Sequence, residues 1–423
     1  MILPEKKVKQ LVGHLFRHEA GKMAAVLTRL LGASHIDVAE DIVQDTLLKA
    51  METWSFHGMP DQPQAWLYTV AKNKALDFIR SQKRHSLIHA ELATLQDSGW
   101  ALSVSMNQLF LENEIQDSQL RMIFACCHPA ISEESQIAMT LKILCGLSTS
   151  EIASAFLTSD ETIQKRIARA KEKLRDQKIK LEVPSPEALP ARLGTVLKTL
   201  YLLFNEGYYA SNNETALRED LCEEAMRLTY LLIQHPQIKL PKVNALMALM
   251  CLQASRFPAR TGSDGSTVLL EKQDRTLWNR ELIQQGLTFL ETAAAGNELS
   301  EYHIEASIAS IHAKAFSFRE TNWNQLLYLY KVLFEIKPEP IVAMNKAIAL
   351  GYAHNPTDAI EELLNIKGLD DNHFYHTALG NFYQLARQKE NALQSYSTAL
   401  KLTRSSKDTE LLQQKITDSE RFP

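Results

Sequence analysis

The residue types best suited to metal chemistry stand together at one point of the chain, Cys126-Cys127-His128. Adjacent cysteines rarely reach one tetrahedral metal ion without strain, and no CxxC pair accompanies them. The sequence also lacks a Walker loop, a dinucleotide fingerprint and a nucleophile paired with a base. We therefore predict that these three residues pack in a core or at a helix end, with no metal, no cofactor and no enzymatic activity.

Residues 148–175 predict a short, tightly joined pair of helices. Ser148 and Glu151 form a capping box for the first helix, and Ser159 can cap the second. Apolar residues of the second helix recur at helical spacing and form one buried stripe: Ile163, Ile167, Ala170 and Leu174. The outer face is basic, with Lys165, Arg169 and Lys173, flanked by Thr162 and Arg166. The pattern is typical of a DNA-binding helix-turn-helix, although an amphipathic helix with a solvated lysine face is the simpler alternative.

A second basic helix is predicted at 64–84. Its polar stripe recurs at helical spacing through Asn73, Asp77, Arg80 and Arg84, and Trp66 lies near its start. A basic helix beside an aromatic ring and a flexible loop suits melted single-stranded DNA, whose bases stack on rings or flip into pockets. The loop 57–62 is the candidate pocket for a flipped base. Taken alone, Trp66 fits a core position better than a stacking platform.

An acidic face characterises the helix predicted at 39–47. Asp41 and Asp45 are four residues apart and repel each other slightly. A helix that keeps such a pair can present it to a basic partner. The alternative is a set of ordinary surface acids.

These helices belong to a chain in which helical periodicity dominates and no convincing set of strands appears. The 423 residues, 45% of them hydrophobic and 23% charged, are enough for two or three domains. No apolar run reaches membrane-spanning length, and the first residues lack a secretory signal. Five cysteines, an odd number, argue against a disulfide framework. We expect a cytoplasmic, all-α protein with an interdomain boundary at Pro184–Pro190.

The net charge of −4 hides an uneven distribution. Residues 160–180 hold eight basic and four acidic residues, and 72–84 hold five basic residues and one acid. Between these blocks, 85–118 contain five acids and no Lys or Arg. Two basic elements joined by an acidic connector indicate nucleic-acid binding by two separate helices.

The C-terminal part contains a repeat-like pattern, His376-x2-Leu379-Gly380-x2-Tyr383 followed by Ala392-x3-Tyr396-x2-Ala399. This is the spacing of a tetratricopeptide repeat with His in place of Trp. Small Gly380 and Ala392 would let two antiparallel helices approach, while the tyrosines fill the gap. A short helical solenoid is expected, with generic paired helices as the alternative.

Taken together, three segments resemble an RNA polymerase sigma factor of the extracytoplasmic-function type. They are AEDIVQDTLLKAMETW (39–54), similar to region 2.2; QAWLYTVAKNKALDFIRSQKR (64–84), similar to regions 2.3–2.4; and LSTSEIASAFLTSDETIQKRIARAKEKLR (147–175), similar to region 4.2. Segments 199–211, 220–232, 269–287 and 302–315 resemble the subgroup with a long C-terminal extension ending in TPR-like repeats. In that subgroup the extension tunes activity.

The resemblance implies that this chain binds two parts of core RNA polymerase, the β′ clamp helices and the β subunit. The residues that it assigns to the β′ clamp helices are Glu40, Asp41, Gln44 and Asp45. It assigns the promoter −10 element to Trp66, Lys72, Asn73, Lys74, Asp77, Arg80, Lys83 and Arg84. It assigns the −35 element to Glu161, Thr162, Lys165, Arg166, Arg169 and Lys173.

The expected domain order is region 2 (5–84), an acidic linker (85–118), region 4 (119–182), a helical extension (191–290) and TPR-like repeats (291–423). The extension could bind a protein or peptide. The main rival is a one-component helix-turn-helix regulator with a TPR sensor, which leaves 12–84 unexplained. A third alternative, a TPR scaffold protein with incidental basic helices, leaves both N-terminal helical blocks unexplained.

Overall fold

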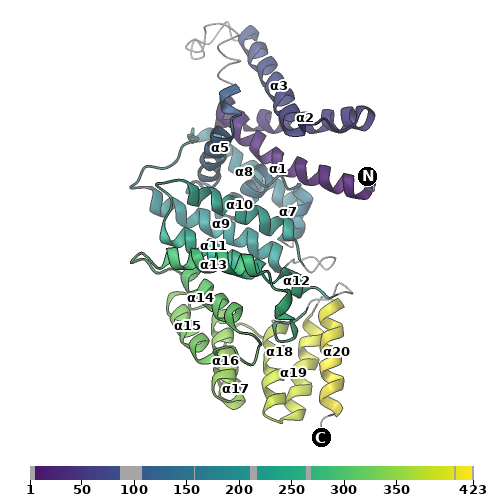
Figure 1. Ribbon diagram of the computed structural model, residues 1–423, viewed down its shortest axis with the longest axis vertical. Helices are drawn as coiled ribbons and strands as arrows, with labels where there is room; N and C mark the ends of the chain where they lie inside the picture. The colour runs from purple at the N-terminus through teal and green to yellow at the C-terminus, as the bar shows by residue number, and fades with distance from the viewer. Residues whose placement is uncertain are drawn as a thin grey trace. The chain divides into compact units, whose positions relative to one another are not determined.

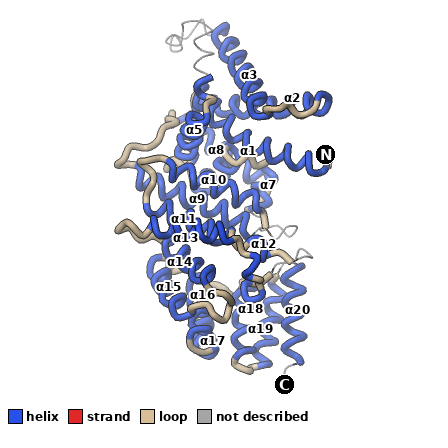
Figure 2. The backbone as a smooth tube through the Cα atoms, in the orientation of Figure 1, coloured by secondary structure: helices blue, strands red, loops and turns tan. Residues whose placement is uncertain are grey.

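The computed structural model describes residues 5–85, 107–156, 158–209, 217–262, 268–403 and 406–421. Within these ranges the chain is helical and contains no β-strand, as the sequence predicted (Figure 2). It divides into two compact units, residues 1–203 and 204–423. The two units are coloured from purple to teal and from teal to yellow in Figure 1.

Unit 1 begins with three long helices and continues with a cluster of shorter ones. The long helices are α1 (Glu5–Leu31), α2 (Ile36–His57) and α3 (Pro63–His85), with the 3-10 turn η1 (Ala33–His35) between the first two. The shorter helices are α5 (Glu112–Cys126), α6 (Glu133–Ile143), α7 (Thr149–Ala155) and α8 (Asp160–Asp176). Helix α9 (Leu189–Tyr209) carries the chain into unit 2.

Helix α1 is the element on which unit 1 is assembled, since it packs against α2, α3, α5 and α6. Gly21 faces the end of α6 so closely that a Cβ atom would overlap the carbonyl oxygen of Leu144. Helix α5 begins at Glu112, within the predicted acidic connector, and its first turn carries Glu112 and Glu114, where the helix dipole favours acids. The long helices α1–α3 and the shorter helices α5–α8, which we call the two halves of unit 1, therefore form one packed body.

The prolines of 184–190 lead directly into α9, with Pro190 in its first turn, where no backbone N–H is needed. The first part of α9, up to Leu203, belongs to unit 1 and is hydrogen-bonded to the end of α5. Arg192 donates to the carbonyl oxygen of Phe124, and the Cys127 thiol donates to the Thr199 hydroxyl at 3.8 Å. The division between the units thus lies inside α9, beyond the proline segment.

Unit 2 has a helix core followed by a row of paired helices. Helix α11 (Pro241–Ala254) is apolar on all sides and is buried among α10 (Glu219–Gln234), α13 (Arg280–Ala293) and α14 (Glu301–Lys314). Short elements join them: α12 (Phe257–Arg260), η3 (Leu270–Lys272) and η4 (Arg275–Leu277). The row consists of α15 (Trp323–Ile336), α16 (Pro340–Ala353), α17 (Pro356–Leu364), α18 (His373–Leu385), α19 (Lys389–Leu402) and α20 (Ser406–Arg421).

Each helix of this row packs against the next one along the chain. Gly380 on α18 faces the ring of Tyr396 on α19, with no room for a Cβ atom. Tyr396 and Ala392 are fully buried, and Tyr383 packs against them. The close approach predicted for α18 and α19 is confirmed.

Candidate nucleic-acid interface

Helices α7 and α8 form the predicted tight pair. The backbone N–H of Glu151 donates to the Ser148 hydroxyl (3.1 Å), and the N–H of Ser148 donates to the Glu151 carboxylate (2.7 Å), which closes the capping box. The Ser159 hydroxyl accepts from the N–H of Thr162 at 3.2 Å. The buried residues of α8 are the four expected: Ile163, Ile167, Ala170 and Leu174.

The outer face of α8 is basic and open. Lys165, Arg169 and Lys173 are exposed, while Thr162 and Arg166 are half-buried beside them. Glu161 is exposed and pairs with Lys165 one turn later, at 2.7 Å. This face carries all six side chains predicted for the −35 element.

Helix α3 presents a second polar face. Asn73, Asp77 and Arg80 are exposed, and Asp77 lies 3.5 Å from Arg80. Two lysines of the predicted set are bonded within the chain: Lys72 donates to Asn107 Oδ1 at 2.5 Å, and Lys74 pairs with Asp45 of α2 at 2.8 Å. Lys83 and Arg84 lie in the last turns of α3, but their side chains lie outside the described residues.

Trp66 lies in an aromatic cluster at the start of α3. Its ring packs edge-on against Trp54 of α2 at 5.5 Å, and Trp54 packs against Phe16 of α1 at 5.4 Å. Trp66 is half-buried, so part of its ring packs in the core. Phe56, just before the 57–62 loop, is 87% exposed, and Met59 within that loop is 47% exposed.

A buried carboxylate fixes where α3 begins. Glu19 of α1 is fully buried and accepts hydrogen bonds from Tyr68 and from Gln64 Nε2 (3.0 Å), both on α3. Lys22 Nζ (3.2 Å) and His18 Nδ1 (3.1 Å) also contact it. Burial alone would raise the pKa of Glu19, but the hydrogen bonds from His18 and Tyr68 and the charge of Lys22 outweigh it and lower the pKa to about 2. Glu19 therefore remains ionised and ties α1 to α3.

The outer face of α2 combines acids with exposed apolar residues. Asp41, Gln44, Leu48 and Met51 follow one another at spacings of three and four residues and are all exposed. Leu48 and Met51 are 56% and 55% exposed. The docking set predicted from the sequence was Glu40, Asp41, Gln44 and Asp45, and it did not include Leu48 and Met51, although the same spacing places them on this face.

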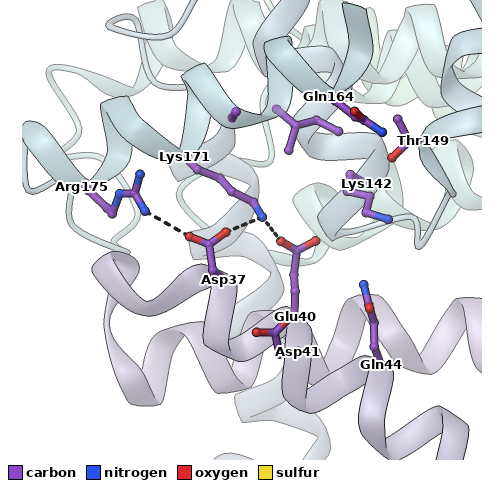
Figure 3. Close-up of a pocket in the computed structure, with 11 residues that line it drawn as sticks. Asp37, Glu40, Asp41, Gln44, Lys142, Thr149, Gln164, Lys171 and Arg175 are labelled. Atoms are coloured by element: carbon purple, nitrogen blue, oxygen red, sulfur yellow. Dashed lines mark hydrogen bonds and ion pairs between the residues drawn. The ribbon is translucent and has the colours of Figure 1, made fainter. Parts of the chain in front are cut away.

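A cavity of about 460 Å³ lies between α2 and α8. Figure 3 shows Lys171 of α8 reaching down between Asp37 and Glu40 of α2, with Arg175 also directed at Asp37. Lys171 lies 2.7 Å from Asp37 and forms an ion pair with Glu40, and Arg175 lies 3.1 Å from Asp37. We call this set of ion pairs the α2–α8 contact. It covers one flank of the acidic face that was predicted to dock on polymerase.

Further ion pairs join the same halves of unit 1. Arg17 of α1 lies 2.6 Å from Glu151, the residue that closes the capping box of α7. Arg29 of α1 pairs with Glu114 (3.0 Å) and Asp117 (2.9 Å) of α5. All these groups are partly exposed, so each pair contributes little alone, but together they fix one orientation.

Comparison with known proteins identifies these two halves. The family models Sigma-70 region 2 and Sigma-70, region 4 match residues 15–85 and 121–174. The chain is 32% identical over 162 residues to the ECF RNA polymerase sigma-E factors of Salmonella typhimurium and Escherichia coli K12, covering 81% of each. The chain belongs to the sigma-70 family, as a sigma factor of the extracytoplasmic-function type. Such proteins direct RNA polymerase to promoters and are not enzymes.

A further family matches part of the extension of this sigma factor, and a further relative matches most of the whole chain. A family of unknown function, DUF6596, matches residues 192–294. An uncharacterised protein, R00370 of Rhizobium meliloti, is 35% identical over 360 residues, which are 84% of both chains. No solved structure matches the chain.

The cysteines of the sigma factor are buried thiols. Cys126 and Cys127 end α5, and the Cys127 sulfur lies 3.9 Å from the Thr140 hydroxyl. Burial raises the pKa of the Cys127 thiol to about 11, and its side-chain hydrogen bonds with Thr199 and Thr140 act in the opposite direction. Within the described ranges no group of His, Cys, Asp and Glu is arranged to hold a metal ion. In the same ranges, no helix is both long and apolar enough to cross a lipid bilayer.

Proposed function

We propose that region 2 of this sigma factor docks on the β′ clamp helices through α2 and reads the −10 element through α3, while region 4 contacts the β subunit and reads the −35 element through α8. Residues 5–84, 85–118 and 119–182 are the corresponding region 2, linker and region 4. The main support is that two basic helices, α3 and α8, flank α2, whose outer face is acidic and apolar. Ser159 caps α8, and Glu19 anchors α3. We place this activity in the cytoplasm, with its polymerase.

The arrangement of unit 1 is a closed, resting form. The −10 and −35 elements lie about 25 base pairs apart, which is about 85 Å along B-form DNA at about 3.4 Å per base pair. Helix α8 contacts α2, and α2 is joined to α3 by the pair between Asp45 and Lys74. Regions 2 and 4 must separate before α3 and α8 reach both elements at once, so the α2–α8 contact must break.

Run-off transcription with core RNA polymerase and the purified full-length chain tests the proposal. A specific start site that depends on the added protein is expected. A one-component regulator would instead bind its operator without polymerase and contribute no promoter opening. That outcome would overturn the proposal.

Arg169 of α8 is the best single test of the −35 assignment because it is exposed on the outer face and away from α2. Arg169→Ala should cost about 1–3 kcal/mol of binding if the side chain reads a base, with the loss concentrated at particular −35 positions. Gel-shift titrations against a set of single-base −35 variants measure this. Uniform weakening on all of them would make Arg169 a phosphate contact, and no weakening would remove it from the interface.

Docking through α2 predicts that Asp41→Lys with Asp45→Lys weakens the association with core polymerase. Asp41 lines the same cavity as Lys142 and Lys171, so a lysine there would add positive charge to the α2–α8 contact and loosen the closed form, which by itself would favour polymerase. A net loss of affinity is therefore a stringent test. Glu291→Lys, which reverses an exposed acid of α13 outside region 2, is the control. Normal competition for core enzyme by the double variant would contradict the docking assignment.

We further propose that the extension, residues 191–290 with TPR-like repeats at 291–423, binds a protein or peptide and sets the balance between closed and polymerase-competent forms. Only a partner that prefers one form can shift that balance. A chain cut after Leu181 would also lose the α9 bonds to Phe124 and Cys127, so a cut after Leu203 is the cleaner test.

Truncation after Leu203 should lower transcription severalfold while leaving DNA binding by α7 and α8 intact. Run-off transcription and gel shifts on the same promoters separate these two effects. Truncation after Leu181 should additionally lower the melting temperature of unit 1. Unchanged transcription by the longer truncated chain, across promoters and salt concentrations, would make the extension an independent docking module.

A further inference from the structure

Unit 2 contains a cavity of about 710 Å³ that the promoter-binding activity does not use. Its walls come from α16, α18, α19 and α20, with Glu271 of η3 at one side. The volume lies within the range of pockets that bind small organic molecules. The lining is mixed: Tyr352, Leu385 and Ala392 are apolar or aromatic, and the other lining residues are polar or charged.

Lys415 on α20 is the central charged group of this cavity. It is half-buried, donates to Asn381 Oδ1 at 2.8 Å and lies 5.8 Å from the centre of the Tyr396 ring. Burial lowers the pKa of Lys415, although the charge of Glu271 acts in the opposite direction. Among the described residues no carboxylate lies within ion-pair distance of its Nζ. An ammonium group in this position retains two N–H donors for a ligand, and the charge of Glu271 acts on it only from beyond ion-pair distance.

The bond from Lys415 also fixes the orientation of Asn381. An ammonium group only donates, so the Asn381 side chain must turn its oxygen toward Lys415. The Tyr396 hydroxyl lies 2.9 Å from the same oxygen and 2.9 Å from Gln384 Oε1. The oxygen of Asn381 is therefore satisfied by the protein, and its NH2 group remains a donor on a residue that lines the cavity.

Two more basic residues complete the lining. Lys389 begins α19 and donates to the carbonyl oxygen of Glu420 at 2.8 Å. Arg387 is exposed in the turn after α18 and has φ +60°, a conformation in which glycine is the usual residue. The described lining thus holds three basic residues against one acid, Glu271.

We propose that this cavity binds an organic carboxylate: the acid head would lie between Lys415, Arg387 and the Asn381 amide, and an apolar body would lie against Tyr352 and Leu385. The carboxylate can belong to a free small acid or to the C-terminus of a peptide. The inference rests on unit 2 alone and stands independently of the promoter assignments.

Ligand-observed saturation-transfer NMR on the full-length chain tests the proposal. The probes are hexanoate, phenylacetate and acetyl-Leu-Phe with a free C-terminus, each compared with its neutral amide. At least one acid should bind. The affinity of its amide should be lower by a factor of about ten or more, because the hydrogen bonds to a charged group are lost. Binding of the small acids points to a metabolite, whereas binding of the peptide acid alone points to a protein C-terminus.

Arg387→Gly and Lys415→Met should each weaken binding of that acid about tenfold or more. Glycine adopts φ +60° without strain, so Arg387→Gly removes the charge while keeping the turn, and its melting temperature should not fall. Lys401→Met, an exposed lysine of α19 outside the cavity, is the matched control and should bind as the unaltered chain does. Equal binding of acids and amides, binding unaffected by both variants, or no binding of any probe would overturn the proposal.

Discussion

Reversing the charges of Lys171 and Arg175 to glutamate is expected to raise the affinity of the full-length sigma factor for core RNA polymerase roughly tenfold or more. Lys171 and Glu40 are the most buried partners of the α2–α8 contact, with 15% and 12% of their side chains exposed. Breaking a fully buried ion pair costs about 3–5 kcal/mol, because the remaining charge stays buried and unpaired. The variant would incur this cost in the closed form and not in the open one.

The expected free-energy shift is smaller than the cost for a fully buried pair, because the charged groups of the α2–α8 contact are partly exposed. Asp37 and Arg175 are about half exposed, so their pair contributes about 1 kcal/mol or less. A net shift of about 2 kcal/mol toward the open form is a factor of roughly thirty in its population. If the closed form predominates, the apparent affinity for polymerase rises by the same factor.

Competition binding to core polymerase without DNA is the decisive measurement, because it excludes any effect of lost charge on promoter contacts. Hydrogen exchange should also become faster in α2 and α8 as the closed form opens. Lys173→Glu, which reverses an exposed charge on the outer face of α8, should leave polymerase affinity unchanged. If the Lys171 and Arg175 variant binds polymerase no better than the unaltered chain, the closed form does not restrain docking.

Local rules of helix formation were sufficient to predict α7 and α8 from the sequence. Capping by Ser148 and Ser159 and the buried stripe of α8 depend on residues within four positions of one another, and the structure confirms them. The face of α2 was predicted for the same reason. Its acids were chosen for their charge, and Leu48 and Met51 were missed because an exposed apolar residue is ordinary in isolation.

The tertiary contacts could not be predicted in this way. In the sequence Lys171 and Lys173 are two lysines of one basic helix, but only Lys171 meets α2, over 130 positions away. Gly21 gives no sign that the Leu144 carbonyl leaves no room for a side chain. Helical spacing indicates which residues share a face and does not indicate what packs against it.

Glu19 shows the same limit, and replacing it should have the largest effect on the stability of region 2. Glu19→Gln removes the charge that Lys22 faces, and it replaces one of the two carboxylate oxygens, which accept from Tyr68 and from Gln64, with an NH2 group that cannot accept. Losing one partner of a buried, hydrogen-bonded charge pair costs about 3–5 kcal/mol. Because the lost bonds also anchor the start of α3, promoter opening at the −10 element should fall with stability. Glu291→Gln, at an exposed acid of α13 outside region 2, should change neither.

The pKa of Glu19 predicts how this stability depends on pH. The folded pKa, about 2, lies below the ordinary value of 4.5, so the unfolded chain binds the proton more readily. The contribution of Glu19 to stability is therefore complete above about pH 5 and is lost as pH falls through 4.5 toward 2. A shift of this size corresponds to about 3 kcal/mol. Urea denaturation from pH 7 to pH 3 should show a steep loss of stability in the unaltered chain and a flatter curve in Glu19→Gln; parallel curves would mean that the carboxylate is not the group that holds α1 to α3.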